Sequence, residues 1–81
     1  MSSKNIDYLD LMNRTKECLN KLGLDTLEIW ITPVRSGYIV ELQPTQDKKS
    51  VDKLAQCLKE FFNVGVFIKE YTYGSVVLIK T

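Results

Sequence analysis

The chain of 81 residues contains no histidine, which removes the commonest general base and the commonest transition-metal ligand. It also has none of the glycine-rich phosphate loops, nucleophile elbows or paired acidic motifs that mark many enzymes. We therefore expect a non-enzymatic protein, with no catalytic residues, no metal site and no cofactor.

Cysteine is scarce as well, since Cys18 and Cys57 are the only two and stand 39 positions apart. Two cysteines are too few for a disulfide-rich scaffold, and their separation excludes the close spacing of zinc ligands. Each lies at the edge of an apolar helical stripe, where a small buried thiol is common. We expect both to be reduced thiols, even if a symmetric fold brings the two sulfurs near each other.

Long apolar runs are missing, because no stretch approaches the ~20 residues of a membrane span and the first residues lack the pattern of a signal peptide. Eleven basic and ten acidic residues give a formal charge of +1, so no overall field attracts nucleic acid or anionic lipid. We expect a soluble cytoplasmic protein with no membrane partner. The length allows one domain, residues 1–81.

Two segments show the helical period. Between residues 6 and 22, apolar side chains recur at three- and four-residue steps, and Gly23 supplies a left-handed stop. Between Asp47 and Phe62 a second apolar stripe follows the same period almost without error, after a start marked by Pro44. Each segment predicts a helix with one buried side.

Four segments alternate with period two. Residues 27–32 and 38–43 are separated by turn residues, and residues 64–70 and 75–80 are separated by a second turn that contains Gly74. Each pair predicts a β-hairpin. The chain therefore reads α-β-β-α-β-β, an α+β two-layer sandwich in which two helices cover one face of a four-stranded antiparallel sheet.

The chain also resembles itself at a shift of 39 positions, which pairs Cys18 with Cys57 and Ile29 with Ile68. The halves would be residues 4–43 and 45–81, each an αββ unit. Duplication and mere shared patterning both explain this similarity. An approximate twofold axis would place either the first strand beside the third or the second beside the fourth at the centre of the sheet, and the sequence leaves both orders open.

The strands carry more apolar surface than two helices can cover. With Leu27, Ile29 and Ile31 facing the helices, their neighbours face the opposite side, and the same alternation applies to the other strands. The fourth strand is apolar on both sides. The far side of the sheet is then predicted to show one apolar pair from the fourth strand together with Trp30, Ile39, Phe67, Lys69 and Tyr71.

An exposed apolar patch of this kind usually marks an interaction site. The leading hypothesis is a small protein-interaction or regulatory module that forms a homodimer through its sheet, by packing of faces or by pairing of edges. Arg35 and Tyr73, at the two hairpin tips, are further candidates for contact with a protein partner.

Two alternatives use overlapping residues. Trp30, Phe67 and Tyr71 with Lys69 would suit a stacking platform for single-stranded nucleic acid, although glutamates in the same neighbourhood disfavour it. A groove between the two halves could instead hold a small molecule, with walls drawn from Trp30, Tyr38, Tyr71 and Tyr73.

Overall fold

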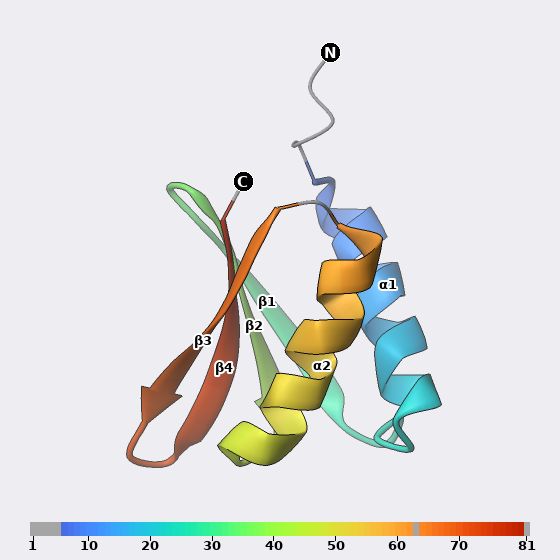
Figure 1. Ribbon diagram of the computed structural model, residues 1–81, viewed down its shortest axis with the longest axis vertical. Coiled ribbons are helices and arrows are strands. Elements are labelled where there is room, and N and C mark those ends of the chain that lie inside the picture. Colours follow the sequence, from blue (N-terminus) through green and yellow to red (C-terminus); the bar gives the residue numbers. More distant parts are fainter. Residues whose placement is uncertain (1–5, 63, 81) are drawn as a thin grey trace.

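The computed structural model describes residues 6–62 and 64–80, and the first two residues of the predicted half 4–43 lie outside this part. The order of the elements is α1 (Tyr8–Lys21), β1 (Glu28–Val34), β2 (Gly37–Gln43), α2 (Lys48–Phe61), β3 (Gly65–Tyr71) and β4 (Gly74–Lys80). This confirms the predicted α+β fold, because both helices lie on the same side of one antiparallel sheet (Figure 1). None of the helices in the described ranges is long and apolar enough to cross a membrane.

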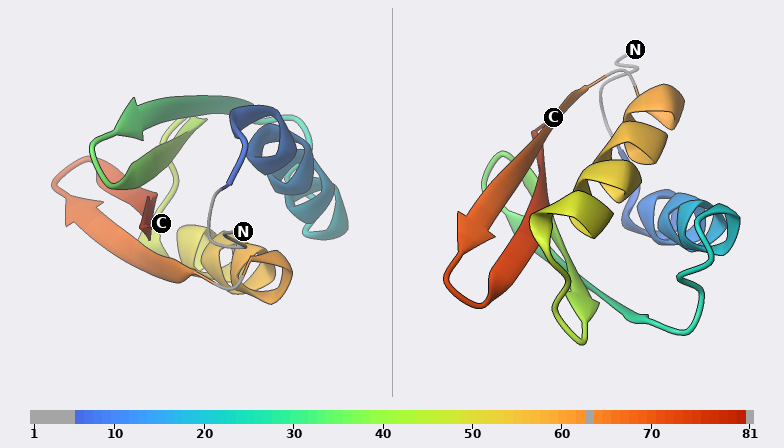
Figure 2. Two further views of the ribbon diagram at one scale, coloured as in Figure 1. Left: turned by 90° about the horizontal axis from the view of Figure 1, so that it is seen from above. Right: turned by 60° about the horizontal axis from the view of Figure 1, so that its bottom comes forward.

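The sheet has the strand order β1-β2-β4-β3, so the second and fourth strands meet at its centre. Of the two orders left open by the sequence, this is the second. The pairing of β2 with β4 sets Tyr38 opposite Ile79 and Val40 opposite Val77. Figure 2 shows the sheet curved around the helices, with α1 on the β1 side and α2 on the β3 side.

The ends of the helices follow from local signals. Gly23, with φ of 74°, ends α1, and the N–H of Leu24 then donates to Leu19 O at 2.8 Å. At the start of α2, the Asp47 carboxylate accepts a hydrogen bond from the Ser50 N–H at 3.0 Å. This bond, followed by the hydrogen bond to the Ser50 side chain, lowers the pKa of Asp47 below its ordinary value of 3.8.

The core lies between the helices and one face of the sheet. Its fully buried members include Leu11 and Leu19 from α1 and Leu54 and Leu58 from α2. Leu27, just before β1, packs against the core, and the sheet contributes alternate residues, which are Ile29, Ile31, Tyr38, Val40, Leu42, Val66, Ile68, Val77 and Ile79. The inward sets predicted from the period-two pattern are therefore confirmed for the first three strands, and Val77 and Ile79 are the inward pair of the fourth.

The shift of 39 positions does not describe the hairpins. Strands β1 and β3 begin at residues 28 and 65, and β2 and β4 begin at 37 and 74, so the hairpins are 37 positions apart, while the helices begin 40 apart at residues 8 and 48. The difference arises because the connection between helix and strand is shorter in the second half. In structural terms Trp30 corresponds to Phe67, and Gly37 to Gly74. The duplication itself stays a prediction.

The expectation of two reduced thiols is wrong in this structure. A disulfide joins Cys18 of α1 to Cys57 of α2, with 5.9 Å between the two Cα atoms. The two sulfurs do lie near each other, as a symmetric fold allowed, because α1 packs against α2 and places the two residues on facing sides. The bond therefore ties the two helices together across the helical layer.

Candidate interaction surface

The face of the sheet that points away from the helices, here called the outer face, carries all five residues predicted for it. Trp30 is 55% exposed and Phe67 is 52% exposed, both high values for such large apolar side chains. Tyr71 and Lys69 are also exposed, and Ile39 is half-buried. The alternation of β1, β2 and β3 places these residues on the side opposite the core.

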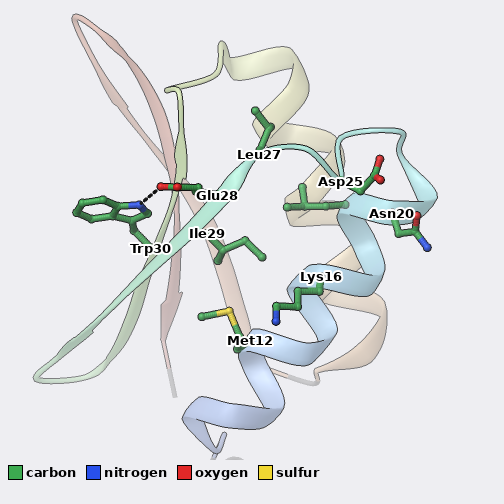
Figure 3. A pocket seen from close by; sticks show the side chains of 9 residues that line it. Met12, Lys16, Asn20, Asp25, Leu27, Glu28, Ile29 and Trp30 are labelled. Atoms are coloured by element: carbon green, nitrogen blue, oxygen red, sulfur yellow. Dashed lines mark hydrogen bonds between the residues drawn. The ribbon is translucent and has the colours of Figure 1, made fainter.

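Trp30 lies on the edge strand β1 between two carboxylates. Its indole Nε1 donates a hydrogen bond to Glu28 Oε1 at 3.2 Å, and Glu41 is its direct neighbour on β2. Figure 3 shows the indole ring pointing away from α1 and lying beside Glu28. The ring thus keeps one polar bond within the chain while most of its apolar surface remains exposed.

The aromatic residues of the second hairpin are partly covered by lysines. The Lys80 ammonium lies 5.8 Å from the centre of the Phe67 ring, and that of Lys69 lies 5.6 Å from the centre of the Tyr71 ring. The Tyr71 ring also stacks on Tyr73, with 5.1 Å between centroids. Such contacts of a cation with an exposed ring are weak, so they do not replace burial against a partner.

Val76 and Leu78 are the outward pair of β4, which settles the choice that the sequence left open. Leu78 is half-buried and stands in a row between Ile39 of β2 and Phe67 of β3, so apolar side chains cross the middle of the outer face. Val76 is buried even though it belongs to this face. Apolar side chains therefore form a continuous patch through Ile39, Leu78 and Phe67. The patch exposes less apolar surface than the sequence predicts, because Val76 is buried.

The two candidate residues of the hairpin tips lie far from each other. Arg35 is in the turn between β1 and β2, and Tyr73 is in the turn between β3 and β4. Because β2 and β4 are antiparallel, these turns stand at opposite ends of the sheet (Figure 1). Both residues are exposed, but they cannot form one site.

The groove predicted between the two halves of the chain cannot have the wall residues that were assigned to it from the sequence. Tyr38 faces the helices, and its hydroxyl donates to Ile6 O at 3.0 Å, whereas Trp30 and Tyr71 lie on the outer face. Residues on opposite faces of a sheet cannot line a common groove. This assignment of walls is therefore wrong.

A groove that the sequence did not indicate runs between α1 and the edge strand β1. It measures about 610 Å³ and is lined by Met12, Lys16, Leu19, Asn20, Asp25, Leu27, Glu28, Ile29 and Trp30. Figure 3 shows Met12 and Lys16 of α1 and Ile29 of β1 pointing toward it. Sequence periodicity could not reveal this groove, because it depends on how far α1 stands from the edge of the sheet.

A smaller groove of about 250 Å³ lies between α2 and the other edge strand, β3. Its lining is more strongly charged, with Lys48, Asp52 and Lys59 on the helix side. Within residues 6–62 and 64–80, no group of three or more acidic or cysteine side chains is placed to hold a metal ion.

Comparison with known proteins found no family model, no curated protein and no solved structure that matches this chain.

Proposed function

We propose that this chain is a small non-enzymatic protein-interaction module that forms a homodimer through its sheet. The observation that carries the proposal is the exposure of Trp30 and Phe67 on a face that neither helix covers. Tryptophan and tyrosine are the side chains most often found at the energetic centre of protein interfaces. Burying a large apolar side chain is favourable by about 1.5 to 3 kcal/mol, so either of these aromatic side chains, once covered by the second copy, adds substantially to the affinity of the dimer.

The surroundings of Trp30 favour a protein partner over nucleic acid. Glu28 and Glu41 stand on either side of the ring on the outer face, where a phosphate backbone would have to approach. A stacking platform needs basic residues along the strand of nucleic acid, and carboxylates at this position oppose it. Titration with labelled single-stranded RNA at several salt concentrations tests this alternative, because binding that weakens with salt would replace the protein-docking proposal.

The cellular location of the protein is a further part of the proposal. The cytoplasm was the location expected from the sequence, yet disulfides persist mainly in oxidising compartments. The Cys18–Cys57 bond therefore weighs against a cytoplasmic location. Trapping of thiols in intact cells, followed by mass analysis of this pair, decides between the two.

Sedimentation velocity over a range of protein concentrations tests the dimer. We expect the wild-type chain to be dimeric at tens of micromolar and the double variant Trp30→Glu/Phe67→Glu to be monomeric, since it places a charge at whichever of the two exposed aromatic side chains the second copy covers. Leu9→Glu is the matched control, because Leu9 is 62% exposed on α1, away from the sheet, and its variant should remain dimeric. A monomeric wild type, or a dimeric double variant, would remove the proposal.

A further inference from the structure

The backbone groups of the edge strand β1 divide into two sets. A two-residue turn joins Val34 to Gly37, so Val34 and every second residue back to Glu28 exchange hydrogen bonds with β2. The intervening residues Ile29 and Ile31 turn their N–H and C=O groups toward the free edge of the sheet. These groups are a template for another strand.

The free edge of β1 is symmetric about Trp30. At one end the N–H of Leu27 is already used, because it donates to Leu24 O at 3.2 Å. At the other end Pro33 has no N–H. The donors available to a new strand are thus those of the two isoleucines on either side of Trp30, and a strand that pairs with itself across a twofold axis has this symmetry.

The groove beside this edge has room for the side chains of an added strand. On the helix side of the sheet, Ile29 points into a space of about 610 Å³ whose far wall includes Met12 and Leu19 of α1. An added strand would place every second side chain in this space. The part of the lining formed by Ile29, Met12 and Leu19 is apolar and suits an aliphatic side chain.

The opposite edge of the sheet, β3, is less suited to pairing. By the same alternation Val66, Ile68 and Glu70 turn their backbone groups outward, but the neighbouring groove measures only about 250 Å³. Lys69 and Glu70 add charge to this strand, and charged residues on an edge strand oppose further pairing. The structure therefore distinguishes the two edges.

We propose that β1 pairs in antiparallel fashion with β1 of a second copy of this chain, about a twofold axis at Trp30. Ile29 exchanges both backbone hydrogen bonds with the partner's Ile31, and Ile31 does so with the partner's Ile29. The sheet then continues across both copies. This inference rests on the proposed function and specifies its edge and its register.

The side chains agree with this register on both faces. On the helix side, the partner's Ile31 lies beside Ile29 and enters the groove next to Met12 and Leu19. On the outer face, Trp30 stands directly opposite the partner's Trp30, in the class of antiparallel pair that brings side chains closest together. Cross-strand aromatic pairs stabilise a sheet, and this one covers the most exposed part of β1.

Charge favours the same register. In this register the partner's hairpin tip, which carries Arg35, points toward the end of the groove where Asp25 lies, although both residues are in turns outside β1. Sliding the two strands by two residues keeps the inward and outward faces but separates Arg35 from Asp25 and breaks the pairing of Trp30 with itself. Complementary charge of this kind fixes register more than it adds affinity.

Two matched proline variants test the edge by sedimentation equilibrium. Ile31→Pro removes an outward N–H from β1, and Ile68→Pro makes the equivalent change on β3, so both spare the hydrogen bonds inside the sheet. We expect Ile31→Pro to raise the dimer dissociation constant about 100-fold or more, and Ile68→Pro to leave it within about threefold. Phe67→Glu alone should also leave the dimer intact, because Phe67 lies on the distant hairpin.

Cross-linking tests the register without relying on a proline. Trp30→Cys places one added thiol from each copy across the twofold axis, so mild oxidation should give a disulfide-linked dimer, while Phe67→Cys, at the equivalent position of the other hairpin, should stay uncross-linked. A dimer that survives Ile31→Pro and is lost with Phe67→Glu, or equal cross-linking of both cysteine variants, would overturn the edge pairing and leave the proposed function standing. A monomeric wild type would overturn both.

Discussion

Breaking the disulfide between Cys18 and Cys57 should remove a large part of the stability of this chain. The two residues close a loop with a sequence separation of 39. In the chain-entropy account, a cross-link over this length restricts the unfolded chain by about 4 kcal/mol at 25 °C. A domain of this size has an unfolding free energy of roughly 4 to 12 kcal/mol in total. We therefore expect the reduced protein to be only marginally folded.

Guanidinium unfolding followed by circular dichroism measures this effect, at one fixed protein concentration because the proposed dimer would also stabilise the fold. Reduction should move the midpoint down by about 1 to 2 M, and the Cys18→Ala/Cys57→Ala variant should behave like the reduced wild type. The dependence of the free energy on denaturant should become steeper, since the reduced unfolded chain exposes more surface. A reductant added to the double variant is the control and should change nothing.

A midpoint of the reduced wild type within about 0.3 M of that of the oxidised protein would contradict this prediction. Intact mass would have to confirm that the protein is fully reduced. That result would mean that the reduced unfolded chain is already about as restricted as the cross-linked one, so the bond adds little stability. A loss seen in the double variant but not on reduction would instead point to the small void left at Cys18, which is fully buried.

Two further predictions concern the backbone and pH. Gly37→Ala should lower the unfolding free energy by about 2 kcal/mol or more, because φ is 154° and an added Cβ would overlap the carbonyl of Ile79. Gly23→Ala, at φ 74°, meets open space and should lower it by about 1 kcal/mol. Chemical denaturation measures both variants, and equal losses would contradict the steric reason. Asp47 has a lowered pKa, so its contribution is present above the ordinary value of 3.8 and is lost as the pH falls through the folded pKa. Asp47→Ala should therefore reduce the melting temperature at pH 7 and have a smaller effect in acid. Asp7→Ala is the control and should have little effect at either pH, because the Asp7 side chain makes no capping bond in α1. An equal loss in melting temperature for Asp47→Ala at pH 7 and pH 2.5 would contradict the capping role of Asp47.

The facing of the strands could be predicted because it depends only on alternation along the chain. Ile29 and Val66 face the core and Trp30 and Phe67 face outward, as the period-two pattern requires. Features that depend on how elements sit against one another could not be predicted in the same way. The disulfide depends on how α1 and α2 pack against each other, and the strand order depends on the pairing of β2 with β4.

The candidate surface shows the same division. Its residues were found from the pattern, but the groove along β1 was missed, because its width depends on the position of α1 rather than on any local signal. The shift of 39 positions failed for the hairpins for a related reason. A repeat aligned on Cys18 and Cys57 follows the helices, and the shorter connection before β3 moves the second hairpin by two positions relative to it.

The disulfide and the uncovered outer face of the sheet are related, because the disulfide offsets the limited apolar burial of this fold. A chain of 81 residues buries a modest fraction of its surface, and here the core is built on one face of the sheet only. Covering the outer face with further chain would have added apolar burial at the expense of the surface offered to a partner. The cross-link between α1 and α2 compensates on the other side, since it lowers the entropy of the unfolded chain without using any part of the sheet. Trp30 and the edge of β1 can then remain exposed without loss of the fold, which is what the proposed pairing of two copies requires.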